Sequence, residues 1–200
     1  MNQSYAMNAV SRLAPSATKM IRADHTKVVA TFHRYQQDTS PDKKRAIANT
    51  VCLDVEIHAQ LEEEIFYPAM RSVDTREITR SIPEHDEIKR LISVVRNMDV
   101  TEAAFDETFM TLMREIMNHV AHEETVLLPE AERSLGEQRL SELGAAMTKR
   151  RLELTAPNAG EMVANTARSF SGAMVAGAGV LVVGALLARR AYSSSRTFRS

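Results

Sequence analysis

Polar residues inside apolar helical faces constrain this chain more than any other feature of its sequence. Apolar residues recur at spacings of three and four in four stretches between residues 18 and 135, a pattern typical of helices that bury one face. The same spacing places six ionisable side chains on these faces: His25, His58, Glu62, His85, His119 and Glu123. Burying a carboxylate without a cation or a proton is costly, and these faces contain no lysine or arginine. The pattern therefore predicts a metal bound in a helical core.

The composition favours helices over sheets. The chain has only 7 glycines, 6 prolines and no tryptophan among 200 residues. Short connections between the four stretches predict an all-α, up-down-up-down antiparallel four-helix bundle, followed by a C-terminal helical extension and a hydrophobic tail segment.

Capping residues and prolines indicate where the helices begin and end. Ser40 and Pro41 suit the N-cap and the first position of the second helix. We expect Pro68 and Pro129 to mark the ends of the second and fourth helices, and Pro83 to kink the third helix or delay its start.

Several side chains are expected to fill the core or to lie at the surface. Ile65, Ile82 and Val126 continue the buried faces, and a helical stripe of methionines is expected in the core: Met110, Met113 and Met117. Cys52 is interpreted as a small buried apolar residue and His33 as a surface residue.

The ligand pattern occurs twice along the chain. The equivalent residues are 60 or 61 positions apart: His25 and His85, His58 and His119, Glu62 and Glu123, Pro68 and Pro129. A histidine and a glutamate four residues apart point the same way from a helix, and imidazole with carboxylate is a transition-metal ligand set. Two half-sites related by a pseudo-twofold axis predict two metal ions with carboxylates between them.

These motifs resemble the hemerythrin-like, HHE cation-binding proteins. The resemblance rests on Asp24-His25, on Glu84-His85 and on the segments HAQLEEEIFYP and HVAHEETVLLP, and it covers about residues 18–135. It implies a non-haem di-iron centre, compatible with an oxo or hydroxo bridge, in which Glu62 and Glu123 bridge the two irons. The terminal ligands would be His25, His58, His85 and His119.

The resemblance also bears on function. Dioxygen carriers of this family have a fifth histidine one turn from that of the third helix, where this chain has Ser81 and Lys89. An incompletely filled centre suits a non-enzymatic protein that binds or senses dioxygen, nitric oxide, peroxide or iron. Two alternatives stay open: a di-iron oxidase or peroxide-reducing enzyme, and a structural bundle with a mononuclear or zinc site.

Several ionisable residues lie next to the predicted ligands. His122 is either an extra ligand or, as we favour, a solvent-facing or outer residue. Glu63, Glu64 and Glu124 are interpreted as solvated charges on helix faces, one of which could orient a histidine N–H group.

Charge and hydropathy divide the chain. Residues 161–200 carry five arginines and one glutamate, which leaves a net charge of −5 on residues 1–160 and argues against a nucleic-acid partner. Residues 170–188 carry no charge and would reach about 28 Å as a helix, just short of a bilayer core. This segment is therefore expected to be either a marginal membrane anchor or a contact between copies of the chain. The single cysteine cannot form an intramolecular disulfide, and the residues after Met1 lack the apolar run of a secretory signal. Both features favour a cytoplasmic metal domain, whether or not the C-terminal segment anchors it to a membrane.

These boundaries predict five parts. They are an N-terminal arm (1–17), the metal-binding bundle (18–135), a helix and linker (136–160), a hydrophobic helix rich in small residues (161–192) and a basic disordered tail (193–200).

Overall fold

The computed structural model describes residues 14–36 and 38–169. All regular secondary structure in these ranges is helical, which confirms the all-α prediction. The elements, with η for a π-helix, are α2 (Ala17–Phe32), α3 (Pro41–Leu61), η1 (Glu62–Phe66), α4 (Tyr67–Met70), α5 (Thr75–Asn97), α6 (Ala103–His122), η2 (Glu123–Leu127), α7 (Leu128–Thr155) and α8 (Ala159–Ser169).

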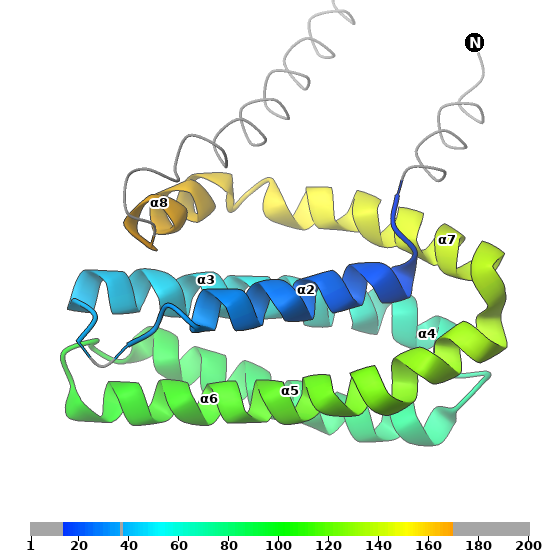
Figure 1. Ribbon diagram of the computed structural model, residues 1–200, viewed down its shortest axis with the longest axis horizontal. Coiled ribbons are helices and arrows are strands. Elements are labelled where there is room, and N and C mark those ends of the chain that lie inside the picture. Colours follow the sequence, from blue (N-terminus) through cyan, green and yellow to red (C-terminus); the bar gives the residue numbers. More distant parts are fainter. Residues whose placement is uncertain (1–13, 37, 170–200) are drawn as a thin grey trace, which may run out of the picture.

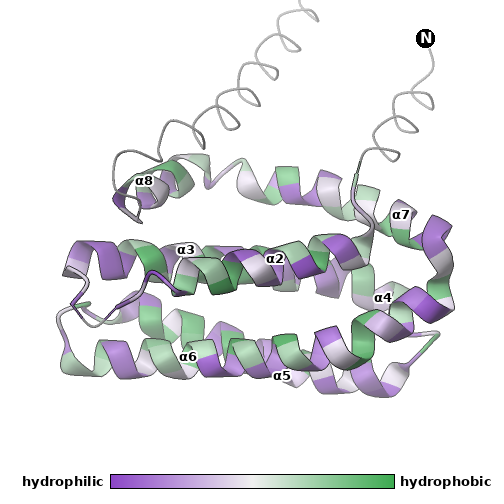
Figure 2. Ribbon diagram, in the orientation of Figure 1, coloured by the Kyte–Doolittle hydropathy of each residue, from purple (hydrophilic) through white to green (hydrophobic). Residues whose placement is uncertain are grey.

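The helices pack in layers. In Figure 1, α2 and α3 lie side by side above a second pair, α5 and α6, and α3 also contacts α5. Helix α7 covers α2 and α3 from the opposite side, and α8 packs on α3. Each helix in Figure 2 carries both hydrophilic and hydrophobic residues, as expected for helices that bury one face.

The helix starts follow the capping residues. Ser40 is the N-cap of α3 and Pro41 its first residue, as predicted. Asp74 caps α5, because its carboxylate accepts hydrogen bonds from the backbone N–H groups of Arg76 at 3.0 Å and Glu77 at 3.2 Å. Helix α5 then continues through Pro83.

The expectation that Pro68 and Pro129 end their helices is wrong for Pro129, which lies at the start of the long helix α7, and only approximate for Pro68, since helical structure ends at Met70. In both copies the α-helix passes into a five-residue π-turn and then returns to α-helix, with the proline in the first turn of the new segment. The N–H of Tyr67 donates to the carbonyl of Glu62, five residues back. This wider turn moves the preceding carbonyls away from the proline ring, so the helix accommodates a residue that would otherwise end it.

The π-turns also shift the buried face. Val126 was predicted to be buried and is 41% exposed, whereas Leu127 and Leu128 are fully buried. Likewise Ile65 is only partly buried, and its neighbour Phe66 is fully buried. Each π-turn contains one extra residue, which advances the buried position by one along the chain.

Two further core predictions are corrected. Ile82 is exposed and Ser81 is buried, because the inner face of α5 follows residues 78, 81, 85 and 88. Met113 is buried as expected, but Met110 and Met117 are exposed at the edge of the inner face of α6.

Two predictions about single residues agree with the structure. Cys52 is fully buried, and burial raises the pKa of its thiol to about 12. His33 is exposed just beyond the end of α2.

Helix α7 is two helices joined at a glycine. Gly136 has φ 73° and ψ 164°, a backbone conformation that glycine alone adopts readily, and the chain folds back there over α2 and α3 (Figure 1). The helix predicted within residues 136–160 is the second part of α7. It comes so close to the start of α2 that a Cβ on Gly144 would overlap the backbone of residues 15–17.

A polar layer divides the apolar core. One cluster packs the starts of α2 and α5 and the end of α3 against α7, and includes Ile21, Leu61 and Met147. The other fills the opposite end of the bundle and includes Val51 and Phe109. Along each of α2, α3, α5 and α6, a histidine lies between residues of the two clusters or at their edge.

The parts of the chain predicted to be an arm, an anchor and a tail lie mostly or wholly outside the described residues. Residues 1–13 of the arm (1–17), residues 170–192 of the hydrophobic helix (161–192) and the whole tail (193–200) are not described. Within residues 14–36 and 38–169, no helix has the length and apolar character needed to cross a membrane.

Candidate metal centre

The structure brings all six predicted ligand residues into the polar layer. His25 comes from α2, His58 from the last turn of α3, His85 from α5 and His119 from the last turn of α6, while Glu62 and Glu123 begin η1 and η2. All six are buried, and the two glutamates have no exposed surface.

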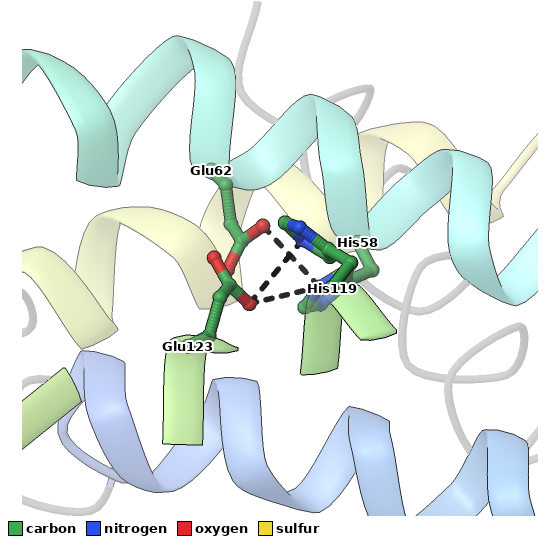
Figure 3. A group of neighbouring side chains, drawn as sticks. All are labelled: His58, Glu62, His119 and Glu123. Atoms are coloured by element: carbon green, nitrogen blue, oxygen red, sulfur yellow. Dashed lines mark ion pairs between the residues drawn. The ribbon is translucent and has the colours of Figure 1, made fainter. Parts of the chain in front are cut away.

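Each histidine–glutamate pair comes from one continuous helical stretch and lies close together. Because the two residues are four apart on a helix, their side chains point to the same side. His58 Nε2 lies 3.2 Å from Glu62 Oε2, and His119 Nε2 lies 3.4 Å from Glu123 Oε2. Figure 3 shows these four side chains directed at one another, and one ligand atom from each lies within 4.8 Å of the others.

The remaining two histidines complete the arrangement. His25 Nε2 lies 3.2 Å from Glu123 Oε2, and His85 Nε2 lies 3.4 Å from Glu62 Oε2. Each carboxylate therefore meets imidazoles from two different helices, which is the pseudo-twofold arrangement that the repeat predicts.

The donor atoms fit a cation better than they fit each other. Among the described residues, the buried polar atoms without a hydrogen-bond partner include Nε2 of His25, Nε2 of His58, Oε1 of Glu62 and Oε2 of Glu123. These nitrogen and oxygen atoms lie close together without being aimed at one another. Lone pairs that converge on a common point in a dry core are satisfied by a metal ion between them.

The charges of the polar layer shift the pKa values of its members. Burial, helped by the negative charge of Glu123, raises the pKa of Glu62. Burial would also raise the pKa of Glu123, but the surrounding imidazoles, above all His119, outweigh it and lower that pKa. Burial lowers the pKa of His25, but the adjacent Glu123 carboxylate outweighs burial and raises it to about 9.

A carboxylate lies near the outer ring nitrogen of each of the four histidines in the polar layer. The Nδ1–oxygen distances are 2.8 Å for His25–Glu124, 2.8 Å for His85–Glu63, 2.9 Å for His119–Glu84 and 3.5 Å for His58–Asp24. A carboxylate at Nδ1 favours the tautomer with hydrogen on that nitrogen, which leaves the Nε2 lone pair free to bind a metal.

Each of these carboxylates is in turn held by a cation. One nitrogen–oxygen distance in each pair is 3.0 Å for Arg22 Nε–Glu124 Oε2, 2.6 Å for Lys89 Nζ–Glu63 Oε1, 3.1 Å for Arg80 Nε–Glu84 Oε1 and 2.6 Å for Arg151 Nη1–Asp24 Oδ1. Burial would raise the pKa of Asp24, but the hydrogen-bonded guanidinium of Arg151 and the nearby imidazole of His58 lower it to about 2. Four chains of imidazole, carboxylate and cation therefore surround the centre.

Two glutamates interpreted as solvated charges are thus part of these chains. Glu63 and Glu124 orient His85 and His25, whereas Glu64 pairs with Arg150 at the surface. Helical periodicity alone could not separate Glu63 from Glu64, because each partner comes from a distant part of the chain.

The family follows from the extent of the sequence match. Residues 16–131, more than half of the chain, match the family model described as the hemerythrin HHE cation binding domain. The chain belongs to this family. Its HHE domain extends from α2 to the beginning of α7.

Two relatives place the HHE domain in context. A crystal structure of an HHE cation binding domain-containing protein from Mycobacterium kansasii has the same fold, with a TM-score of 0.64 and 18% identity over 78% of this chain and 99% of that one. A DNA nickase from Nostoc sp. is 32% identical over 138 residues, which cover 65% of this chain and 38% of the nickase. The chain therefore spans well under half of the length of that relative.

Tyr67 is a residue of the HHE centre that the sequence reasoning missed. Its hydroxyl lies 3.1 Å from Glu123 Oε1, 3.3 Å from Glu62 Oε2 and 3.2 Å from His85 Nε2. Burial, and then the charge of Glu62, raise the pKa of this phenol. The sequence did contain a signal, because the second copy of the repeat has the apolar Leu128 at the equivalent position.

His122 lies in the outer part of the HHE domain. It is buried rather than solvent-facing, and its Nε2 atom lies 2.6 Å from Glu77 Oε2. This pairing favours an outer position over a ligand role.

A small cavity adjoins the four imidazoles. Its volume is about 20 Å³, room for about one water-sized molecule. Apart from the four histidines and Asp24, its lining is aliphatic: Val28, Val55, Ala59, Ile88, Ile116 and Val120. The space beside the HHE centre is therefore small and apolar.

Proposed function

We propose that this chain is a non-haem di-iron protein that binds or senses a small ligand such as dioxygen, nitric oxide or peroxide. The scaffold would be a hemerythrin-like bundle of α2, α3, α5 and α6 in up-down-up-down order. One observation carries the proposal: six buried donors converge beside an aliphatic cavity of about 20 Å³. Such a cavity suits a ligand of two or three atoms.

Each residue of the centre has a definite task. Glu62 and Glu123 would bridge the metals, and the four histidines would hold their outer sides through Nε2. A bound iron pair would supply Lewis acidity and accessible redox states. The Tyr67 hydroxyl keeps its proton, because its pKa is raised, and can donate a hydrogen bond to the Glu123 carboxylate.

The donor set supports iron over zinc. Structural zinc sites are commonly closed tetrahedra rich in cysteine, whereas imidazoles combined with carboxylates are typical of non-haem iron. Cys52, the single cysteine, belongs to the apolar cluster and not to the polar layer.

The same geometry bears on the enzymatic alternatives. The cavity has no room for an organic substrate, but a peroxide-reducing enzyme needs only a small oxidant and stays the second candidate. We do not extend nicking activity to this chain, because it matches 38% of the nickase and residues 1–160 carry a net charge of −5.

Elemental analysis and optical spectroscopy test the proposal. After iron-replete expression we expect about two irons per chain, and absorption bands that change reversibly with dioxygen or nitric oxide. Glu62→Ala should lose dinuclear binding, and Glu107→Ala, at an exposed position of α6, should keep it. Stoichiometric zinc without iron would overturn the proposal, and sustained peroxide consumption would move the protein to the enzymatic class.

A further inference from the structure

The helix that follows the family match reaches back to the metal centre. The match ends at residue 131, and Arg151 lies in the second part of α7. The guanidinium of Arg151 donates Nη1–H to Asp24 Oδ1 at 2.6 Å and Nη2–H to the other oxygen, Oδ2. An arginine that holds both oxygens of a carboxylate fixes its orientation as well as its charge.

Asp24 passes this orientation on to a ligand residue. Its Oδ2 atom lies 3.5 Å from Nδ1 of His58, a buried nitrogen that makes no hydrogen bond among the described residues, and Nε2 of the same ring lies 3.2 Å from Glu62 Oε2. Asp24 and His58 come from α2 and α3, so the chain of contacts from Arg151 to Glu62 crosses three helices before it ends in η1.

This chain depends on its cation more than the other three do. The Asp24–His58 distance of 3.5 Å is the longest of the four, so the imidazole alone holds the carboxylate weakly. The Asp24 side chain is 11% exposed, which limits help from water, and Arg151 is its only other partner of opposite charge among the described residues.

The packing of α7 against α2 positions Arg151 beside Asp24. Leu140, Leu143 and Met147 are buried in the apolar cluster beneath α7, and Gly144 lets the helix touch the start of α2. Gly144 and Arg151 are seven residues apart, two helical turns, so they lie on the same face of α7.

We infer that Arg151 is a positioning residue of the metal centre: it holds Asp24, which sets the tautomer and orientation of His58. The second part of α7 then completes the centre and is more than a cover over α2 and α3. This inference rests on the proposed metal site.

Metal affinity of matched arginine variants tests the inference. Arg150 is adjacent in sequence but pairs with Glu64 at the surface, so Arg150→Gln is the control for loss of charge. We expect Arg151→Gln to lower the affinity for Fe²⁺ and Co²⁺, measured by chelator competition, by about 10- to 100-fold. Arg150→Gln should bind both metals with wild-type affinity. Arg151→Lys should recover part of the affinity, because lysine restores the positive charge but cannot hold both carboxylate oxygens as the guanidinium does.

Two further measurements separate positioning from general loosening. The Co²⁺ absorption spectrum should change in Arg151→Gln and not in Arg150→Gln. In a double-mutant cycle, Asp24→Asn should cause a similar loss of affinity, and the double variant should lose little more than either single variant. Losses of affinity that add up in the double variant would overturn the inference. A loss of affinity in Arg151→Gln that is explained by a lower melting temperature of its apo protein would also overturn it.

The outcomes also separate this inference from the proposed function. Wild-type protein that binds neither Fe²⁺ nor Co²⁺ would overturn both. Wild-type protein that binds metal with the same affinity as Arg151→Gln would overturn the inference alone.

Discussion

The four histidines use their two ring nitrogens for different purposes. Nε2 points into the polar layer, and Nδ1 points out to a carboxylate that a cation holds. Neutral imidazole has one donor and one acceptor nitrogen, so an acceptor at Nδ1 leaves Nε2 as the acceptor. The outer carboxylates are thus expected to govern metal affinity although none touches the inner donors.

Glu63 and Glu64 provide a direct comparison at the residue scale. Glu63→Gln removes the charge that faces His85 Nδ1 and Lys89, and we expect metal affinity to fall by about 10-fold or more. Glu64→Gln alters surface contacts with Arg150 and Gln60 and should leave the affinity unchanged. Calorimetric titration of both apo variants with Fe²⁺ measures the difference, and equal affinities would show that the carboxylate at Nδ1 has no such role.

Tyr67 supports the carboxylates from within the layer. Tyr67→Phe keeps the ring stacked on His85 but deprives both glutamates of a neighbouring hydroxyl. Leaving a buried acceptor unpaired costs about 1–3 kcal/mol, so the apo protein should lose stability by that order. Denaturant unfolding of the apo protein gives the value. Phe66→Leu, which alters the adjacent apolar side chain, should leave the spectrum of the iron-loaded form unchanged, whereas Tyr67→Phe should alter it.

At the scale of elements, the π-turns explain which parts of the structure the sequence could predict. The spacing of His58 and Glu62 holds in any helix, so the six inner residues and their helices could be predicted from periodicity alone. Periodicity could not predict that Leu127 rather than Val126 is buried. The sequence up to the π-turn has the same spacing as an ordinary α-helix, and the buried position moves by one residue only within the turn.

The outer residues were hidden for a different reason. Arg151 and Asp24 are 127 positions apart, and their contact depends on the reversal of α7 at Gly136. Short-range spacing contains no information about such a pair. A proline six residues after the glutamate in both copies was the one local sign of the π-turns, and it was interpreted as a helix end.

The reversal within α7 can be tested with a pair of glycines. Gly136 has positive φ, and a Cβ added there would meet nothing within 4 Å, so Gly136→Ala should cost about 1–3 kcal/mol through backbone strain alone. Gly160 lies in α8, also with open space around it, so Gly160→Ala should be neutral or slightly stabilising. Unfolding free energies from urea titration compare the two, and a neutral Gly136→Ala would mean that the chain reverses elsewhere.

At the scale of the whole molecule, the core is two apolar clusters joined by a polar layer, so stability depends on how the charges of that layer are balanced. The raised pKa of Glu62 means that the folded apo protein binds more protons than the unfolded chain over a window above the usual glutamate pKa of 4.5. For His25, the stabilisation is complete below pH 6.5 and is lost as pH rises through about 9. Both groups therefore make the apo protein less stable as pH rises.

Iron should reverse this dependence, because a bound cation keeps both glutamates ionised and the imidazoles neutral. We expect the apo protein to unfold more easily at about pH 9 than at about pH 6, and the stability of Glu62→Gln to fall less over this range because it lacks one of the two titrating groups.

Iron binding to the folded state alone should add about 2.7 kcal/mol to the stability at a free iron concentration a hundredfold above Kd. Glu62→Gln should gain little of this, although its apo form should be at least as stable as wild-type apo protein at about pH 8, since it removes a buried charge. Thermal melts of both proteins, with and without iron, measure all of these differences. A Glu62→Gln protein that keeps the full iron-induced stabilisation would show that Glu62 does not bridge the metals.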